Sequence, residues 1–455
     1  MSRRRRLILG GAVVVIALAI AVAVYAYNQN QPIEKRGSAT DEFVTTAEPE
    51  QESPPPKPED PRPWPTYGYD IARSHISPFK QRPPYRRIWS IDAHDTIEFP
   101  PTVGYGKVYV PQQKGLFFAL DSRTGRVRWR KATNRCAAAS PTIGKGVVYQ
   151  SYMDWVPCPQ GNPGATGYLI AWDANTGRTR WRYRGAPIES SPLLRNGVLF
   201  FGSWDHKVHA ISAKNGKPKW SFQADNEVNT SPAYWKGTIY IADDSGTLYA
   251  LNAGSGRLKW RAQSHAGFTG SREFFYATPT LAYGRVYIGN TDGTMYVFGA
   301  RTGRLLWARP LGSYIYGAAA VWRRRVFVGT YDGKLYALDA ATGDTIWQIE
   351  APGAVHSSPT VMDGLVYYAT CSTCGSAAQR TVKHGPDGTR AVRARDGHEV
   401  WSFADGKYAN PVVADDHRIY ITGRAQQYAL AMPKKLRAER AAKRKKRKQS
   451  QADRR

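Results

Sequence analysis

Hydrophobic and polar residues follow one repeating pattern over most of the chain from Pro100 onward. Each unit contains a proline, a short apolar stretch, a glycine turn and a Val-Tyr-like alternation. A polar turn, a Leu-Tyr-Ala-Leu-like alternation and a closing Gly-x-x-x-Trp follow. Alternation with a period of two is typical of strands with one buried face, and the Gly, Asn and Asp clusters between them are typical of turns. Each unit therefore predicts four short antiparallel strands.

The Gly-x-x-x-Trp motif occurs seven times, and successive tryptophans are separated by 39 to 54 residues. A repeat near 40 residues with four strands per unit is typical of a β-propeller blade. The seven motifs end at Trp129, Trp181, Trp220, Trp260, Trp307, Trp347 and Trp401.

Two further segments set the blade number. After Trp401 the strands 410–413, 418–421 and 427–430 form an eighth set without a closing motif. The isolated strand 87–91 contains Trp89, 40 residues before Trp129, and can supply the missing outer strand. Pairing the two ends of the chain leaves no open sheet edge. We therefore predict an all-β, eight-bladed β-propeller over residues 66–432, closed by an N-terminal strand.

The unit resembles the pyrroloquinoline quinone repeat of eight-bladed quinoprotein dehydrogenases and of propeller proteins in outer-membrane assembly. Residues 64–70, with the sequence Trp-Pro-Thr-Tyr-Gly-Tyr-Asp, and Arg73 resemble the lead-in of such propellers. The resemblance covers residues 64–432. It implies the fold, but it leaves activity open, because the same fold carries both enzymes and scaffolds.

In the enzymes of this family, a quinone lies between a tryptophan floor and a ring made by two adjacent cysteines, with calcium and an aspartate base beside it. This chain has no Cys-Cys pair and lacks large insertions. We expect no cofactor, neither pyrroloquinoline quinone nor calcium, and no catalytic or metal-binding residues. The repeat tryptophans, with Trp89, are expected to pack between blades, where large aromatic area is buried.

The N-terminal residues resemble a membrane signal-anchor. Residues 7–27 carry no charge and follow four arginines at positions 3–6. As a helix they would extend about 31 Å, the thickness of a bilayer core. The arginines would keep residues 1–6 in the cytoplasm and place the propeller outside. A cleaved signal peptide is the alternative, because residues 21–23, Ala-Val-Ala, resemble a cleavage site.

The net charge of +28 is unevenly distributed: residues 1–27 carry +4, 28–65 carry −4, 66–432 carry +18 and 433–455 carry +10. Residues 28–65 are acidic and proline-rich, which predicts an extended linker. Residues 433–455 predict a basic disordered tail, either simply solvated or bound to polyanions. Outside the membrane these are anionic lipids or wall polymers rather than nucleic acid.

The four cysteines predict disulfides. In a propeller the D-to-A and B-to-C loops share one face, the loop face, and the A-to-B and C-to-D turns share the other, the turn face. Cys136 and Cys158 lie in two such loops of one unit, so we predict that they are bonded. Cys371 and Cys374 predict a short local disulfide, with a redox role of this Cys-x-x-Cys pair as the alternative.

Insertions at residues 151–167 and 370–387 enlarge the loop face, which also carries residues 270–276. Elaborated loops on a rigid scaffold commonly carry binding functions. Exposed aromatic residues there would suit a protein or glycan surface, and packing within the loops is the alternative. The candidates are Tyr152, Trp155, Phe274 and Phe275.

The residue three positions before the proline of each inner strand, or its equivalent, is expected to face the mouth of the central channel. Two carboxylates, an amide and an imidazole in this ring could hold a cation or a small polar ligand. A hydrated mouth without a ligand is the alternative. The ring comprises Glu98, Ala138, Glu189, Asn229, Tyr276, Tyr316, His356 and Tyr408.

Together these features predict a monomeric, membrane-anchored, extracytoplasmic propeller. We expect a non-catalytic binding or scaffold protein whose loop face meets an envelope protein or an anionic wall or lipid polymer. A quinone-dependent or other redox enzyme is the alternative.

Overall fold

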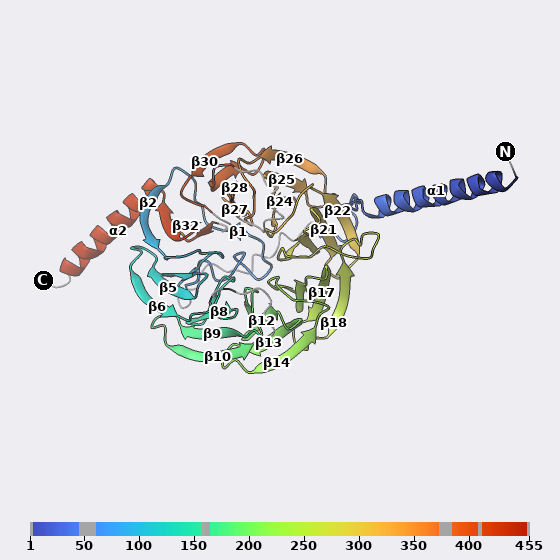
Figure 1. Ribbon diagram of the computed structural model, residues 1–455. Coiled ribbons are helices and arrows are strands. Elements are labelled where there is room, and N and C mark those ends of the chain that lie inside the picture. Colours follow the sequence, from blue (N-terminus) through green and yellow to red (C-terminus); the bar gives the residue numbers. More distant parts are fainter. Residues whose placement is uncertain are drawn as a thin grey trace.

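The computed structural model describes residues 3–44, 61–156, 158, 164–372, 385–407 and 412–452. Eight antiparallel sheets surround a central axis, and one helix projects from each end of the chain (Figure 1). The prediction of an all-β, eight-bladed propeller is therefore confirmed.

The blades are numbered in chain order, and their strands run A to D from the axis outward. Blade one contains β3 (Thr102–Gly104), β4 (Lys107–Pro111), β5 (Leu116–Asp121) and β6 (Val127–Ala132). Blade two contains β7 (Thr142–Gly144), β8 (Val147–Tyr152), β9 (Gly167–Asp173) and β10 (Thr179–Gly185). Blade three contains β11 (Leu193–Arg195), β12 (Val198–Ser203), β13 (Lys207–Ser212) and β14 (Pro218–Gln223). Blade four contains β15 (Ala233–Trp235), β16 (Thr238–Ala242), β17 (Thr247–Asn252) and β18 (Leu258–Gln263).

The second half of the ring continues the same order. Blade five contains β19 (Thr280–Ala282), β20 (Arg285–Gly289), β21 (Thr294–Gly299) and β22 (Leu305–Pro310). Blade six contains β23 (Ala320–Trp322), β24 (Arg325–Gly329), β25 (Lys334–Asp339) and β26 (Thr345–Glu350). Blade seven contains β27 (Thr360–Met362), β28 (Leu365–Thr370), β29 (Gly388–Arg393) and β30 (Glu399–Phe403), with β1 (Ile76–Ser77) parallel to β27. Blade eight contains β31 (Val413–Ala414), β32 (Arg418–Gly423) and β33 (Gln426–Ala431).

Blade eight is completed by the N-terminal strand β2 (Arg86–Asp92). This strand pairs antiparallel with β33, from Arg86 opposite Ala431 to Asp92 opposite Gln426. The closure is the one that the sequence predicts. It joins the two ends of the propeller by backbone hydrogen bonds and gives blade eight its outer strand.

The Gly-x-x-x-Trp motif links neighbouring blades. The indole of Trp129 lies on Gly177 of blade two, where an added Cβ would be 2.8 Å from the ring, and its N–H donates to the carbonyl of Ala174 at 3.1 Å. Gly177 also has a φ of +71°, which favours glycine. The glycine of each motif thus receives the preceding tryptophan. The same contact recurs for Trp89, Trp181, Trp220, Trp260, Trp307 and Trp347.

Trp401 of blade seven makes a different contact. Blade eight takes its outer strand from the other end of the chain, so it has no C-to-D turn whose glycine could receive this indole. The ring instead meets Tyr85 edge-on, with 5.3 Å between centroids. One of the eight blade junctions is therefore sealed by aromatic packing just before β2.

The lead-in crosses the inner strands of the propeller. Arg73 is fully buried and donates to the carbonyl oxygen of Pro232 at 2.9 Å and to Oγ1 of Thr66 at 2.8 Å. The carbonyls of Ile71 and Ala72 accept hydrogen bonds from blades four and five, and that of His75 accepts one from blade seven. The lead-in therefore fastens several blades to each other near the axis.

Helix α1 (Arg3–Gln29) forms where the apolar N-terminal segment predicts a helix, and it projects away from the ring (Figure 1). Its described apolar side chains, among them Val14, Leu18 and Val24, are exposed. No helix within the described residues is long and apolar enough to cross a membrane. The predicted transmembrane span is therefore not supported.

The predicted linker differs from an extended spacer in its first part. Lys35 forms a β-bridge with Ala308 of blade five. The Arg285 guanidinium donates to the carbonyls of Ser38 and Asp41 at 2.6 and 2.5 Å. Residues 33–44 are thus held against blades five and six, because the backbone of this segment finds partners on the outer strand and the turns.

The C-terminal segment is helical rather than disordered: α2 spans Pro433–Ala452. Proline suits the first position of a helix, and the Ala, Lys, Arg, Glu and Gln that follow are strong helix formers. Glu439 accepts two hydrogen bonds of 2.8 Å from Arg418, whose side chain is only 4% exposed. The basic helix therefore starts from a fixed point on blade eight.

The A-to-B turn of blade six differs from the usual one. In six blades the second turn residue is a glycine with positive φ, such as Gly284 and Gly364. In blade six the turn is Arg323-Arg324, with φ of +47° and +62°. A non-glycine residue in the left-handed region costs roughly 1 kcal/mol. The backbone of this turn is therefore more strained than that of the six turns that carry glycine.

Candidate functional site

The predicted mouth residues come together on the loop face. The hydroxyl of Tyr276 donates to Oε1 of Glu189. Its ring meets that of Tyr316 at 5.0 Å between centroids, and Tyr316 stacks on His356 at 5.7 Å. Ala138 is buried. Tyr408 lies outside the described residues.

A second layer of residues, from the B-to-C turns, supports the mouth. Trp204 donates to Oδ1 of Asn229 at 2.6 Å, and Asn229 donates to Oδ2 of Asp244 at 2.8 Å. Gln113 donates to Glu98 at 3.3 Å. Tyr331 packs against both Tyr316 and His356, with centroids 4.9 and 5.2 Å away. Sequence reasoning missed this layer, although aligning the B-to-C turns as well as the D-to-A loops would have found it.

The carboxyl groups of the mouth hold their protons unusually tightly. Burial raises the pKa of Glu98 to about 7, the charge of Glu189 adds to the shift, and the hydrogen bond from Gln113 opposes it. Burial likewise raises the pKa of Asp244 to about 7, again with a contribution from Glu189. The pKa of Glu189 is also raised by burial, against the hydrogen bonds from Tyr276 and Trp204. The charge of the mouth therefore changes around neutral pH.

His356 completes the mouth as a neutral group. Burial lowers its pKa to about 4, so the imidazole is uncharged at neutral pH. Its Nδ1 atom is buried and has no hydrogen-bond partner among the described residues. The ring can therefore donate or accept one further hydrogen bond at this place.

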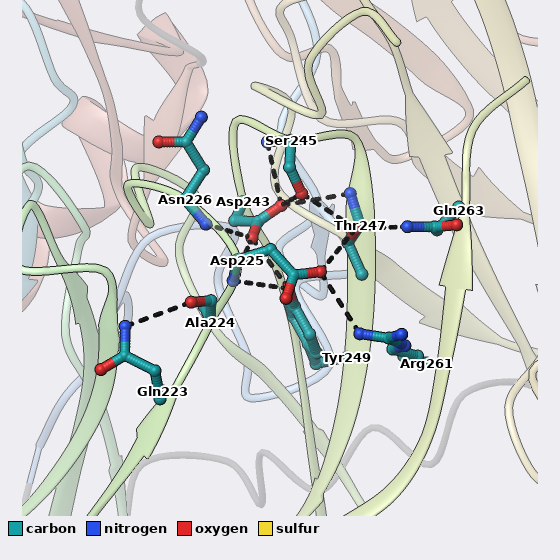
Figure 2. Close-up of polar contacts among 10 residues, drawn as sticks. All are labelled: Gln223, Ala224, Asp225, Asn226, Asp243, Ser245, Thr247, Tyr249, Arg261 and Gln263. Atoms are coloured by element: carbon teal, nitrogen blue, oxygen red, sulfur yellow. Dashed lines mark hydrogen bonds and ion pairs between the residues drawn. The ribbon is translucent and has the colours of Figure 1, made fainter. Parts of the chain in front are cut away.

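Asp243 and Asp244 are neighbours with opposite surroundings. Asp243 is fully buried and fixes the B-to-C turn of blade four against the preceding loop (Figure 2). Asp244 accepts from Asn229, while its buried Oδ1 lacks a partner among the described residues. Asp243 thus belongs to the framework and Asp244 to the mouth. The donors to Asp243 are the N–H groups of Asp225, Asn226, Ser245 and Thr247 and the hydroxyls of Ser245 and Tyr249, at 2.6 to 3.2 Å.

Disulfides reinforce the loop face. The predicted bond between Cys136 and Cys158 is confirmed. Beside it, the guanidinium of Arg135 lies 4.2 Å from the ring of Trp155 and donates to the carbonyl of Thr166 at 2.7 Å. Cys371 is also disulfide-bonded. Cys374, its predicted partner, and most of the second insertion lie outside the described residues.

The predicted aromatic surface is only half correct. Trp155 and Phe274 are 53% and 43% exposed. Tyr152 and Phe275 are instead fully buried, because they pack onto Trp172 and Tyr296 in the blade interiors. Strand-end aromatics therefore complete the core, and those further along the loops remain at the surface.

The mouth residues do not fit pyrroloquinoline quinone. This cofactor carries three carboxyl groups, whereas the described mouth contributes three carboxyl groups of its own, those of Glu98, Glu189 and Asp244, and no lysine or arginine. Six of the seven repeat tryptophans lie on glycines between the blades and Trp401 meets Tyr85, so they supply no floor. Within the described residues, no group of three or more His, Cys, Asp or Glu side chains could hold a metal ion. A small neutral or cationic polar ligand suits this chemistry better.

Known proteins give two kinds of similarity. The assembly factor BamB of Bordetella pertussis is 27% identical over 141 residues, covering 30% of this chain and 33% of the relative. A quinohemoprotein alcohol dehydrogenase of Comamonas testosteroni is 28% identical over 166 residues, covering 32% and 22%. The chain thus spans a third or less of these relatives' length.

Structural comparison agrees on the fold. The crystal structure of BamB from Moraxella catarrhalis superposes with a TM-score of 0.61 at 15% identity, covering 77% of this chain and 100% of that one. The family described as outer membrane protein assembly factor BamB matches residues 84–154, 163–320 and 315–437, which is most of the sequence. The chain therefore belongs to this family of repeat propellers.

Proposed function

We propose that the protein is a non-catalytic scaffold of the cell envelope that binds a partner protein on its loop face. The observation that carries this proposal is the exposure of Trp155 and Phe274 on a loop face whose backbone is held by a disulfide and by buried carboxylates. Exposed aromatic residues on rigid supports are frequent anchors of protein interfaces. Relatives named assembly factors give the partner class, a protein of an envelope complex.

The location is part of the same proposal. Disulfides such as that between Cys136 and Cys158 persist in oxidising compartments outside the cytoplasm. We infer that the propeller acts on the extracytoplasmic side.

The mouth offers a central contact for the partner. Near neutral pH the carboxyls of Glu98 and Asp244 are partly ionised, and the buried Oδ1 of Asp244 accepts no bond from the described residues. A lysine or an amide entering the mouth would supply the missing donor. The aromatic residues around the rim would then bind apolar parts of the same partner.

In-cell cross-linking tests the proposal. A photoreactive amino acid replaces Trp155 or Phe274 on the loop face, and Lys145 or Arg178 on the turn face as matched controls. We expect one envelope protein to be captured from the two loop positions and not from the controls. Capture of the same proteins from all four positions, or of none from the loop positions, would contradict the proposal.

A quinone-dependent enzyme remains the second candidate because quinoprotein dehydrogenases are relatives at similar identity. The purified protein is mixed with pyrroloquinoline quinone and calcium, and its absorption is recorded after removal of free quinone. A scaffold retains no quinone. Retention of one quinone per chain would favour the enzyme.

A further inference from the structure

A second candidate site lies on the turn face, between blades six and seven. A cavity of about 470 Å³ opens there, and five arginines line it. They come from three parts of the chain: the lead to β2, the A-to-B turn of blade six with the first residue of β24, and the C-to-D turn of blade seven. The lining includes Arg82, Arg323, Arg325, Arg393, Arg395 and the indole of Trp322.

Two arginines of the cavity lie at turn positions whose residue differs between blades. Arg323 is the first residue of the A-to-B turn of blade six and has a positive φ, and the flanking blades five and seven carry Tyr283 and Asp363 at this position. In blade seven, Arg393 occupies the C-to-D turn position at which Asp121 and Asp173 accept the N–H groups of their turns at 2.9 to 3.1 Å. Arg323 thus places a cation where the flanking blades have a tyrosine and an acid, and Arg393 places one where blades one and two have an acid.

The arginines are only partly neutralised. Arg82 pairs with Asp363 at 2.9 Å, while Arg393 and Arg395 share Asp396 at 3.0 and 3.1 Å. The guanidinium of Arg323 lies over the indole of Trp322 at 4.6 Å. Arg325 donates to the carbonyl of Ala394 at 2.7 Å. Within the described residues, five guanidinium groups thus face two paired carboxylates. Uncompensated like charges at this spacing repel each other and favour a bound anion.

The start of helix α2 extends the positive charge. The backbone N–H of Arg82 donates to Sδ of Met432, directly before Pro433. Lys435 of the first helical turn reaches the carbonyl of Asp416 in the A-to-B turn of blade eight. The basic helix therefore begins beside the cavity and on the same face.

We propose that this cavity binds a phosphate ester. Guanidinium groups match phosphate oxygens by paired, charge-assisted hydrogen bonds, and an indole suits the less polar part attached to the phosphate. The volume exceeds that needed by inorganic phosphate and suits a headgroup or a sugar phosphate. The phosphate ester belongs either to an anionic lipid or to a soluble or polymeric sugar phosphate. This function is separate from partner binding on the loop face.

The test compares two double variants of the full chain with equal charge. The cavity variant is Arg323→Asn/Arg395→Ser, and the control, in the C-to-D turns of blades one and two, is Arg126→Asn/Arg178→Ser. Asparagine tolerates the left-handed conformation at position 323. Calorimetry in detergent measures binding of glycerol 3-phosphate and pyrophosphate, and flotation measures capture by vesicles with and without phosphatidylglycerol.

We expect the cavity variant to lose at least tenfold in affinity for one class of probe while the control keeps wild-type binding. Loss with the soluble probes assigns a soluble phosphate ester, and loss confined to phosphatidylglycerol vesicles assigns a lipid. The proposal is overturned if no probe binds the wild type, if both variants bind like the wild type, or if both variants lose binding equally.

Discussion

The two faces of the propeller carry opposite chemistry. The mouth on the loop face gathers three carboxyl groups, those of Glu98, Glu189 and Asp244, with pKa values raised by burial. The cavity on the turn face gathers five arginines. The mouth is built from equivalent positions around the ring, whereas the cavity is built from arginines of two adjacent blades and of the lead to β2. One site therefore follows the repeat around the ring, and the other belongs to a single blade junction.

This difference also separates framework residues from site residues. A framework group has all its hydrogen bonds within the propeller, as Asp243 does. A site group is left with unused bonding capacity or charge, as Asp244 and Arg323 are. Substitutions should therefore have opposite consequences for the two kinds of residue, even where they are neighbours in sequence.

The largest expected effect concerns Asp243. Replacing Asp243 by alanine leaves several buried N–H and hydroxyl donors without an acceptor. It should therefore lower the free energy of unfolding by about 4 kcal/mol. Asp244→Ala is the matched control and should change it by less than about 1 kcal/mol. Urea unfolding measures both. If both variants lost the same free energy of unfolding, Asp244 would belong to the framework as Asp243 does.

Next comes the disulfide of the loop face. The double variant Cys136→Ser/Cys158→Ser opens a link between residues separated by 22 positions and should cost about 3 kcal/mol, mainly through the unfolded chain. Thermal unfolding measures the loss, and phosphate binding on the turn face should be unchanged. If the variant were as stable as the wild type, the disulfide would contribute nothing to the stability of the loop face.

The third effect is the pH dependence of stability that the mouth residue Glu98 causes. The folded-state pKa of Glu98, about 7, lies above its ordinary value of 4.5. Its protonation therefore stabilises the fold fully below pH 4.5, and this contribution is lost as the pH rises to 7. At pH 8 the free energy of unfolding of Glu98→Gln should exceed that of the wild type by about 2 kcal/mol, a value lowered to allow for the partial exposure of Glu98. At pH 4 the two proteins should be equally stable. Denaturant unfolding at both pH values checks this, and a pH-independent difference would refute it.

The smallest effect is expected at the turn of blade six. Arg324→Gly restores the residue found in six other blades and should raise stability by about 1 kcal/mol, because glycine adopts a positive φ without strain. Arg324 does not line the cavity, so phosphate ester binding should persist. A stability decrease would mean that its contact with the Phe43 ring, 5.3 Å away, outweighs the strain.

The sequence predicts the framework far better than the sites. Periodic strands, the closing strand with Trp89 and the bond between Cys136 and Cys158 follow from spacing and topology alone. Tyr152 and Phe275 were assigned to the surface wrongly, because a strand end and a loop start look alike in sequence. The helix in the tail was not predicted, because a dense run of basic residues indicates disorder even where, as here, the residue types also favour a helix.

The sites depend on contacts between blades, which spacing does not encode. The alignment that places Glu189 and Tyr276 in one ring does not reveal that Asp244 and Trp204 stand behind them. The arginine cavity joins residue 82 to residues above 320, and nothing local marks that meeting. Its one trace in the repeat is Arg393, which stands where blades one, two and six carry aspartate.

The motif that joins neighbouring blades has a consequence for how such a ring arises. Within five residues, the glycine accepts the indole of the blade before and the tryptophan reaches the glycine of the blade after. A duplicated gene segment of one repeat therefore carries both halves of the joint, and the new copy fits at any position between two existing ones. Adding a whole repeat therefore requires no compensating substitution in the neighbouring blades. The junction between blades seven and eight, where Trp401 meets Tyr85, uses a different contact.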